Sequence, residues 1–340
     1  MRTAPQTSAL AESAARLATL VPRSRLDPAV LAWADGPGRN RKWAVAFSGG
    51  ADSFALLLLL WAHWPGKRRT LSALHFDHRL RGAESRADAR FCRRMCAALR
   101  VPFIVGRWEG AHGSAGEAQA RAARMAFFAT HARVVWLGHQ QDDIAESMLM
   151  RLARGSGTGG LAAPRPVQPM PGGRVHLRPL LTLKKADIVA ALSAAGIAWR
   201  EDSSNAGPLF FRNRIRSRVI PAWQEAAQRD ALAGASRSRA LLEEDDAALE
   251  GWVDDMALLD TDDGLMLSRL AGKPAALWRR ALHRWLLAQP RAGELSRQAF
   301  DALLAAIRCG APTRHSLGRE GFAVVRKGVL AFARNRKRTS

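Results

Sequence analysis

The sequence predicts an α/β fold, a doubly wound parallel sheet, with a smaller and mainly helical carboxyl-terminal domain. Three observations support this prediction. Short apolar runs alternate with helical patterns between residues 43 and 139. A glycine-bearing turn, SGGADS at 48–53, directly follows the first apolar run. After residue 220 the pattern becomes helical, with little sign of strands. Strands and helices that alternate through short loops are typical of parallel sheets.

The expected elements follow in order along the chain. A short helix at 8–20 lies in a leader at 1–40, which ends in the stretch ADGPGRNRK. Strands are expected at 43–47, 71–76, 102–108 and 134–139. Helices are expected at about 52–63, 84–99, 116–131 and 142–153. The segment 154–164 is too rich in glycine to favour regular structure. In such a sheet, ligands bind outside the carboxyl ends of the strands.

These expected elements divide the chain into four parts. After the leader, a nucleotide-binding catalytic domain is expected at 41–221 and a linker helix at 222–250. A carboxyl-terminal domain follows at 251–340, with two helices within 275–308 and a small hairpin at 311–334.

The charge balance points to a polyanionic partner. The 52 basic residues outnumber the 30 acidic ones and give a net charge of +22. Seven of the basic residues are lysines and tyrosine is absent, as a GC-rich coding sequence would produce. That bias explains arginine in place of lysine, but not the excess of base over acid. Nucleic acid is the first partner to consider.

The cysteine count and the apolar runs bear on the compartment. Three cysteines cannot form a disulfide framework, and the first residues show no apolar signal core. The apolar run at 54–62 is far shorter than the roughly 18–20 residues that span a bilayer. We therefore expect a cytoplasmic protein with no membrane partner.

The turn at 48–53 has the composition of a phosphate cradle. It fits neither the Walker A spacing nor the dinucleotide fingerprint. Gly49 and Gly50 let the backbone approach an anion, while Ser48, Ser53 and the start of a helix supply donors. Asp52 would repel a bare phosphate, so it implies a cation such as Mg²⁺. The alternative is a structural turn in which a serine or the aspartate caps the helix.

A second group of polar residues, in GHQQDDIAES, lies where the last expected strand gives way to a helix. His139, Asp142, Asp143 and Glu146 converge on that first turn and predict a cation and substrate site. The alternative is helix capping and dipole pairing by the acids.

Basic residues recur in two further places. Glu117, Arg121 and Arg124 share one helical stripe, which suits either a surface salt bridge or a site. Arg154 and Arg178 lie on expected loops, where a cation can stabilise phosphate charge.

The segment FFRNRIRSRVIP places Arg212, Arg214, Arg216 and Arg218 at alternate positions beside Asn213. These arginines could form a solvated helix face. Beside a nucleotide site they would hold RNA backbone or an α-phosphate.

Taken together, these motifs resemble a known family. SGGADS after an apolar strand resembles the pyrophosphate loop (PP-loop) of the ATP pyrophosphatase superfamily, with an adenine nucleotide alpha hydrolase-like fold. The segments at 73–92, 116–128, 138–164 and 201–221 resemble, in order and spacing, those of bacterial tRNA(Ile)-lysidine synthetases. The resemblance is close over residues 42–221 and loose beyond them.

The resemblance implies a two-step ligation that uses ATP, Mg²⁺ and L-lysine. The wobble cytidine (position 34) of the isoleucine tRNA with a CAU anticodon is first adenylated at its C2 oxygen, with release of pyrophosphate. Lysine then displaces AMP at C2, so that the tRNA reads AUA instead of AUG. The carboxyl-terminal domain would bind tRNA.

The resemblance also implies roles for the residues named above. The catalytic residues would be Asp52, His139, Asp143 and Arg212. Nucleotide would be held by Ser48, Gly49, Gly50, Ala51, Asp52, Ser53, His78 and Arg121, and Mg²⁺ by Asp52 and Asp143. Lysine and tRNA would be held by Glu117, Arg124, Asp142, Glu146, Arg154, Arg178, Asn213, Arg214 and Arg216.

Other functions stay open. Another PP-loop enzyme, such as a tRNA thiolase, is the main alternative, although the chain has no CxxC. A non-enzymatic RNA-binding protein would not need these motifs. The sequence leaves open the oligomeric state, with a homodimer as one option, and how tRNA(Ile) is told from tRNA(Met). It also leaves open which acid handles the lysine proton and whether the tRNA-binding module is complete.

Overall fold

The computed structural model describes residues 4–78, 83–108, 117–201, 211–259, 263–289, 295–318 and 321–335. The chain divides into two compact units, an amino-terminal unit at Met1–Glu243 and a carboxyl-terminal unit at Glu244–Ser340. Within the described residues, no helix is long and apolar enough to cross a membrane.

A six-stranded sheet in the order β3-β2-β1-β4-β6-β5 forms the centre of the amino-terminal unit. Its strands are β1 (Trp43–Ala46), β2 (Leu71–Asp77), β3 (Phe103–Arg107), β4 (Val134–Trp136), β5 (Val167–Met170) and β6 (Arg174–Leu177). Neighbours from β3 to β6 pair in parallel, with Trp43 opposite Leu71 and Val134 opposite Val175. The predicted parallel α/β sheet is confirmed.

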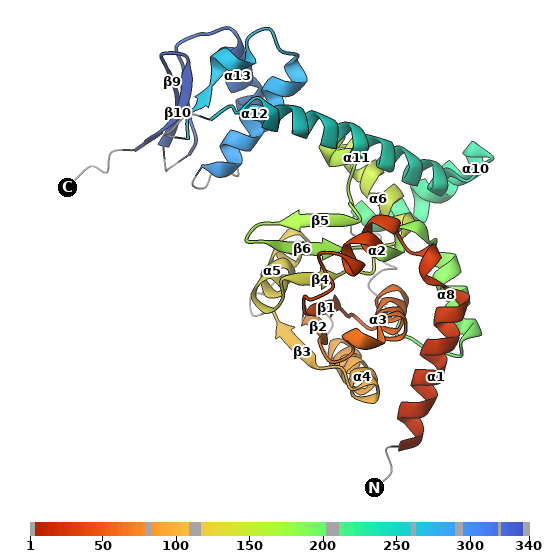
Figure 1. Cartoon of the computed structure of the whole chain (residues 1–340). Coiled ribbons are helices and arrows are strands. Elements are labelled where there is room, and N and C mark those ends of the chain that lie inside the picture. The colour runs from red at the N-terminus through yellow and green to blue at the C-terminus, as the bar shows by residue number, and fades with distance from the viewer. Residues whose placement is uncertain are drawn as a thin grey trace. The chain divides into compact units, whose positions relative to one another are not determined.

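Helices cover both faces of this sheet (Figure 1). Strand alternation explains the two layers, because Trp43 and Val45 enter one apolar cluster while Ala44 enters another. The first cluster packs under α1 (Ala4–Leu20), α2 (Pro28–Asp35), α3 (Ala51–His63), α4 (Ala83–Leu99) and α8 (Lys185–Ala194). The second packs under α5 (Glu117–His131). The first 40 residues, expected as a leader, contribute Leu17 and Val30 to the main core.

Two details of this unit differ from the sequence-based expectations. The hairpin β5–β6 was not predicted, because its strands are short and Pro169 lies within β5. Gly172 and Gly173, at φ of 73° and 67°, make the turn between them. The segment 154–164 was expected to lack regular structure, yet α7 (Thr158–Leu161) forms one helical turn there. A single turn closes because Leu161 N donates to Gly157 O at 3.0 Å.

The segment after residue 210 also departs from expectation. The single linker helix predicted at 222–250 is two helices, α10 (Ile220–Ala227) and α11 (Ala231–Asp255). Gln228 adopts a left-handed φ of 48°, and the Asp230 carboxylate accepts from Ala233 N at 3.1 Å, so one helix stops and another starts. Before them lie α9 (Phe211–Arg214) and a π-helical segment, η5 (Ile215–Val219). These elements pack on α6 (Gln141–Leu152).

The carboxyl-terminal unit has its own core of large side chains, among them Trp278, Leu282 and Trp285. Helices α12 (Ala275–Ala288) and α13 (Arg297–Arg308) accompany an antiparallel sheet in the order β7-β10-β9-β8. Its strands are β7 (Leu265–Met266), β8 (Arg314–Ser316), β9 (Gly321–Arg326) and β10 (Val329–Arg334). Short 3₁₀ turns in the chain are η1 (Arg23–Arg25), η2 (Pro65–Lys67), η3 (Pro179–Thr182) and η6 (Leu267–Leu270). The expected hairpin at 311–334 is confirmed as β9–β10.

Candidate active site

A cavity of about 1180 Å³ opens at the carboxyl ends of β1, β2 and β4. Ser48, Asp77 and His139, which follow or end these three strands, all line it. Residues from α3, α5 and α6 complete the wall, including Asp52, Arg124 and Asp143. The parallel sheet therefore brings the separate polar motifs to one edge, as its topology requires.

Hydrogen bonds between its own serines stabilise the turn between β1 and α3. Ser48 N donates to Ser53 Oγ at 3.2 Å, and the two serine hydroxyls are 3.0 Å apart. Gly49 has a φ of +92°, and a Cβ there would lie 3.0 Å from Cys92 Sγ. Glycine is thus required by backbone angle and by space. The turn leads directly into α3, whose amino-terminal N–H groups and dipole favour an anion.

Asp52 is the one acid of this turn, and its surroundings do not satisfy it. Among the described residues, Oδ1 is buried and has no hydrogen-bond partner. Burial raises the pKa of Asp52 to about 6, with Lys185 lowering it and Asp143 raising it further. A buried carboxylate oxygen with an empty coordination position is suited to a hard cation.

The acids at the start of α6 are, by contrast, used locally. Asp143 Oδ2 accepts from Gln140 N at 2.9 Å, and Gln140 Oε1 accepts from Asp142 N at 2.6 Å. Asp142 Oδ2 accepts from Lys185 N at the start of α8, at 3.0 Å. The capping role left open by the sequence is therefore real for Asp143, whose carboxylate belongs to the capping box of α6, whereas the Asp142 carboxylate binds the first turn of α8.

Arg212, on α9, and Arg216, on η5, join these two elements to α6 through a buried network. Arg212 Nη2 lies 2.6 Å from Asp143 Oδ1, and its Nε lies 2.6 Å from Glu146 Oε2. Arg216 Nε lies 2.5 Å from Glu146 Oε1, and the Glu146 side chain is 0% exposed. Burial lowers the pKa of the Arg212 guanidinium, but Asp143 and Glu146 outweigh it and leave the pKa raised. Both arginines are therefore fixed cations beside the cavity.

His139 and Arg178 form a third group. Arg178 Nε donates to His139 Nδ1 at 3.3 Å, while its Nη atoms donate to Arg165 O and Gln168 Oε1 at 2.7 and 2.8 Å. Burial and the Arg178 charge hold the pKa of His139 far below its usual range. The ring is thus neutral, with Nδ1 as acceptor. Burial and Arg121 lower the pKa of Arg178 to about 10.

The remaining predicted residues divide into two groups. Gly50, Ala51, Ser53, His78, Arg121 and Arg124 line the cavity together with Ser48, Asp52, His139, Asp143, Arg178 and Arg216. Outside the lining found among the described residues are Gly49, Asp142, Glu146 and Arg212. Arg154 and Arg214 are exposed, and neither they nor Asn213 belong to the lining found among the described residues. Arg214 instead lies over the Phe211 ring, at 5.8 Å from its centroid. Glu117 begins α5, and its side chain lies outside the described residues.

Sequence reasoning missed several residues that line the cavity, above all Lys185, Asp88 and Arg200. Asp88 and Arg200 are 112 residues apart, and no local spacing signals that they meet. The start of α8 carried no motif that would have singled out Lys185.

No cysteine is among the cavity-lining residues that the structure describes. Cys92 and Cys96 are buried and free, as expected of a packed pair, and burial raises the pKa of both thiols. In the described ranges, no three His, Cys, Asp or Glu side chains are grouped to hold a metal.

Comparison with known proteins matches this chain to one family. Residues 28–223 match the family model of the PP-loop domain. The chain is 37% identical over 276 residues to the tRNA(Ile)-lysidine synthase of Geobacter sulfurreducens, which covers 76% of this chain and 56% of that protein. It is 40% identical over 302 residues to the tRNA(Ile)-lysidine synthase of Azoarcus sp. BH72, and the match covers 83% of this chain and 63% of that protein. It is 45% identical over 183 residues to the tRNA(Ile)-lysidine synthase of Solibacter usitatus, and this match covers 52% of this chain and 40% of that protein.

The chain thus spans from 40% to 63% of the length of these relatives. The matched family model, in contrast, takes in the sheet, the glycine turn, α6 and the Arg212 network. Since that model covers more than half of the sequence, the chain belongs to the PP-loop domain family.

Proposed function

We propose that this chain is a cytoplasmic tRNA(Ile)-lysidine synthase, a ligase that joins L-lysine to C2 of cytidine 34 in the CAU-anticodon isoleucine tRNA at the expense of ATP. The observation that supports it best is one cavity that combines two chemically different groups. The glycine turn at 48–53, with Asp52, lines it together with Asp143 and Arg216. An adenylating ligase needs both a phosphate site and an acceptor site.

In the first step, the C2 oxygen of the cytidine attacks the α-phosphorus, and the bond from that phosphorus to the β-phosphate oxygen breaks. Pyrophosphate leaves with the electron pair. The turn amides and the Ser48 hydroxyl would hold the leaving pyrophosphate. Arg216, which lines the cavity, would stabilise charge on the α-phosphate.

A magnesium ion would bind in the cavity at Asp52, beside the glycine turn. Its partnerless oxygen and raised pKa are relieved when a cation binds. Asp143 uses both oxygens within the protein, so it would act on the ion mainly through its charge. Bound Mg²⁺ would supply neutralisation of the phosphate charge.

In the second step, the ε-amine of lysine attacks C2 and the C2–O bond to AMP breaks. The amine must first lose the ammonium proton. Asp143 lines the cavity whereas Glu146 is sealed behind Arg212 and Arg216. We therefore assign to Asp143 the task of orienting the ammonium, with Glu146 holding the arginines.

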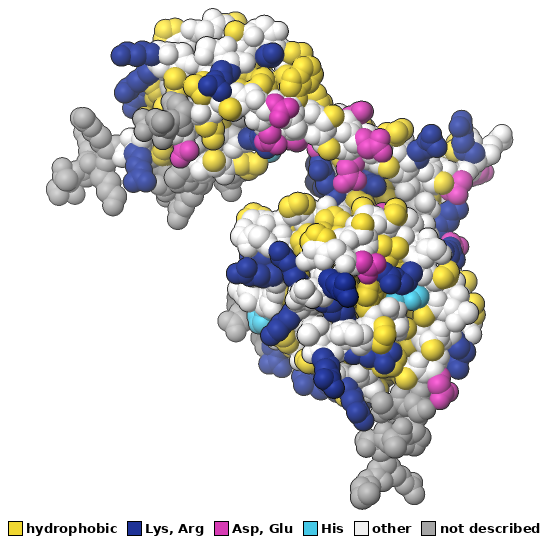
Figure 2. Space-filling model, in the orientation of Figure 1, with side chains coloured by type: hydrophobic (Ala, Val, Ile, Leu, Met, Phe, Trp, Pro, Cys, Tyr) yellow, Lys and Arg dark blue, Asp and Glu magenta, His cyan; other side chains and the backbone are white. Residues whose placement is uncertain are grey.

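The tRNA would be held largely by charge. Figure 2 shows lysine and arginine side chains spread over this face of the amino-terminal unit. The net charge of +22 favours binding of a polyanion such as tRNA. The carboxyl-terminal unit would add contacts to the tRNA body.

A thiolase is disfavoured by the sulfur chemistry. Of the cavity-lining residues that the structure describes, none is a cysteine. Cys92 and Cys96 are buried with raised pKa values, and Cys309 lies in the other unit. Reactive cysteines need the opposite, a lowered pKa and access.

The test is incorporation of labelled lysine by the full chain with ATP. The substrates are unmodified transcripts of the CAU isoleucine tRNA and of the methionine tRNA, beside a reaction without tRNA. We expect label in the isoleucine transcript alone, with one AMP formed per lysine. AMP release that does not require tRNA, or an isoleucine transcript that gains no label, would overturn the proposal.

A further inference from the structure

The segment after α8 crosses directly over the phosphate turn. Arg200 N donates to Gly49 O at 3.0 Å, which ties residue 200 to the glycine with the left-handed backbone. Trp199, Arg200 and Glu201 all line the 1180 Å³ cavity. The main chain of Arg200 is therefore tied to the turn.

The Arg200 side chain continues over the turn and is held by α4. Its Cγ would lie 3.7 Å from a Cβ built at Gly49, and its Nε donates to Asp88 Oδ1 at 2.8 Å. The Asp88 side chain is 10% exposed, and that of Arg200 is 41% exposed. Within the part of the chain described, the recorded bond uses Nε, so the Nη atoms of the guanidinium can donate to a ligand.

The ion pair with Asp88 uses one donor of the Arg200 guanidinium. A guanidinium presents a planar fork that matches the oxygens of a phosphate. Arg178 and Arg216 already have protein partners deeper in the cavity. Arg200 lies instead beside the turn where a terminal phosphate would enter.

We propose that Arg200 binds the pyrophosphate portion of the nucleotide, and that Asp88 is a positioning residue that holds its guanidinium over the phosphate turn. This inference deepens the proposed function and shares with it only the premise that the cavity takes ATP.

The rival explanation is a purely structural clasp. The bond from Arg200 N to Gly49 O would then suffice, and the side chain would be dispensable. Replacing Arg200 with alanine separates the two, because it keeps the main-chain donor and removes the guanidinium.

The measurement is calorimetric titration of the full chain with inorganic pyrophosphate and, separately, with AMP, without tRNA or lysine. For Arg200→Ala we expect roughly 10- to 100-fold weaker pyrophosphate binding, the loss of one hydrogen bond to a charged group. AMP binding should stay within about twofold. Arg25→Ala is the matched control, since Arg25 pairs with Asp187 at 2.9 Å and is 44% exposed. Unchanged pyrophosphate affinity in Arg200→Ala would overturn the proposal.

Asp88→Asn tests the positioning role. If Asp88 holds the guanidinium in place, this variant weakens pyrophosphate binding although it removes a negative charge. If Asp88 only dilutes the positive charge, binding becomes stronger, and the positioning role is refuted. Arg200→Lys keeps the cation without Nε and should bind pyrophosphate with an affinity between those of alanine and arginine. It also serves if the alanine variant fails to fold, as judged by near-ultraviolet circular dichroism. Because no tRNA or lysine is present, these results stand or fall separately from lysine transfer.

Discussion

Each unit contains a buried network of arginines and carboxylates. The two networks use the same residue types for different purposes. In the amino-terminal unit, Arg212 and Arg216 grip Glu146 beside the 1180 Å³ cavity. In the carboxyl-terminal unit, Arg280 pairs with Asp246 at 2.5 Å and with Glu250 at 2.6 Å. Both networks hold two helical elements together.

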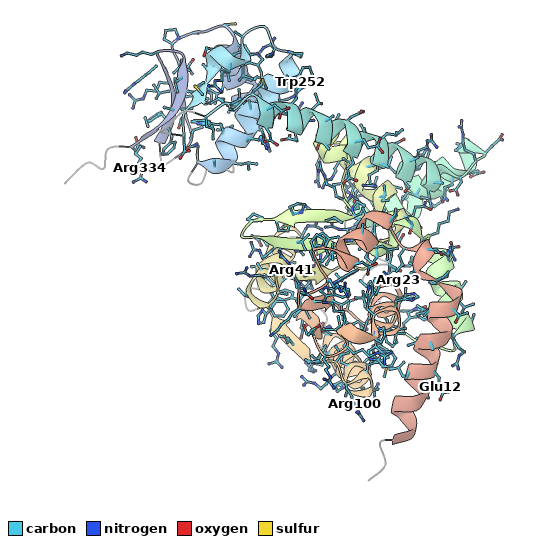
Figure 3. All side chains as sticks on the ribbon, in the orientation of Figure 1. Glu12, Arg23, Arg41, Arg100, Trp252 and Arg334 are labelled. Atoms are coloured by element: carbon cyan, nitrogen blue, oxygen red, sulfur yellow. The ribbon has the colours of Figure 1, made fainter. Side chains whose placement is uncertain are left out.

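The difference lies in what borders each network. The first contributes Asp143 and Arg216 to a cavity that also contains the unsatisfied Asp52. The second joins α11 to α12, and none of its residues lines the 550 Å³ cavity found among the described residues of that unit. Trp252, labelled on α11 in Figure 3, is half exposed. Buried charge alone therefore does not make a candidate active site, whereas the first network lies beside an unpaired acid and a phosphate turn.

The largest effect should come from breaking the first network. Glu146→Gln leaves Arg212 and Arg216 without their fully buried counter-charge, which should cost about 3–5 kcal/mol of unfolding free energy. Lysine transfer should also be lost, because Arg216, which would stabilise charge on the α-phosphate, no longer has its recorded partner. Urea denaturation and the labelled-lysine assay measure the two effects. Near-wild-type stability would show that the network is not closed as described.

Asp52→Asn should separate activity from stability. We expect AMP formation to fall roughly 100- to 1000-fold, since the group that would hold the cation is gone. Binding of tRNA, measured by filter retention, should stay within about twofold. An equal collapse of tRNA binding would contradict the separate roles of the turn and the basic surface.

The same variant should be more stable than the parent at high pH. The folded pKa of Asp52, about 6, is raised above the usual aspartate value of 3.8, so ionisation destabilises the fold as pH rises through this interval. After allowance for partial exposure, the gain from Asn should be roughly 1–2 kcal/mol at pH 8 and near zero at pH 4. Chemical denaturation at both pH values, without nucleotide, measures it. A gain that is equal at both would contradict the raised pKa.

Breaking the second network should affect stability alone. Asp246→Asn removes a charge that is 4% exposed, but Arg280 keeps Glu250, so we expect about 1–3 kcal/mol of destabilisation. Binding of ATP should not change, as calorimetry can check. Weaker ATP binding would break the contrast between the two networks.

The smallest effect is expected at Arg154. It is exposed and lies outside the described cavity lining, so Arg154→Ala should change stability by less than about 0.5 kcal/mol. If Arg154 touches tRNA, as the sequence suggested, the salt dependence of tRNA binding should fall by about one counterion. An unchanged salt slope would remove it from the tRNA contacts.

The sequence predicts well what local pattern controls. The four strands from β1 to β4 and the turn at 48–53 follow from apolar alternation and from glycines that the backbone requires. It cannot show that Arg212 meets Asp143, because the two residues lie 69 positions apart in the chain. It likewise misses the bond between Arg200 and Asp88. These contacts depend on how whole elements pack, which no short spacing records.

The central claim is that the cavity activates the C2 oxygen of cytidine 34 with ATP. A transcript of the CAU isoleucine tRNA that carries ¹⁸O at this C2 position tests it directly. We predict that the AMP released during lysine transfer contains the ¹⁸O, because the C2–O bond breaks in the second step. AMP without the label, formed while lysine is joined to the tRNA, would contradict the account.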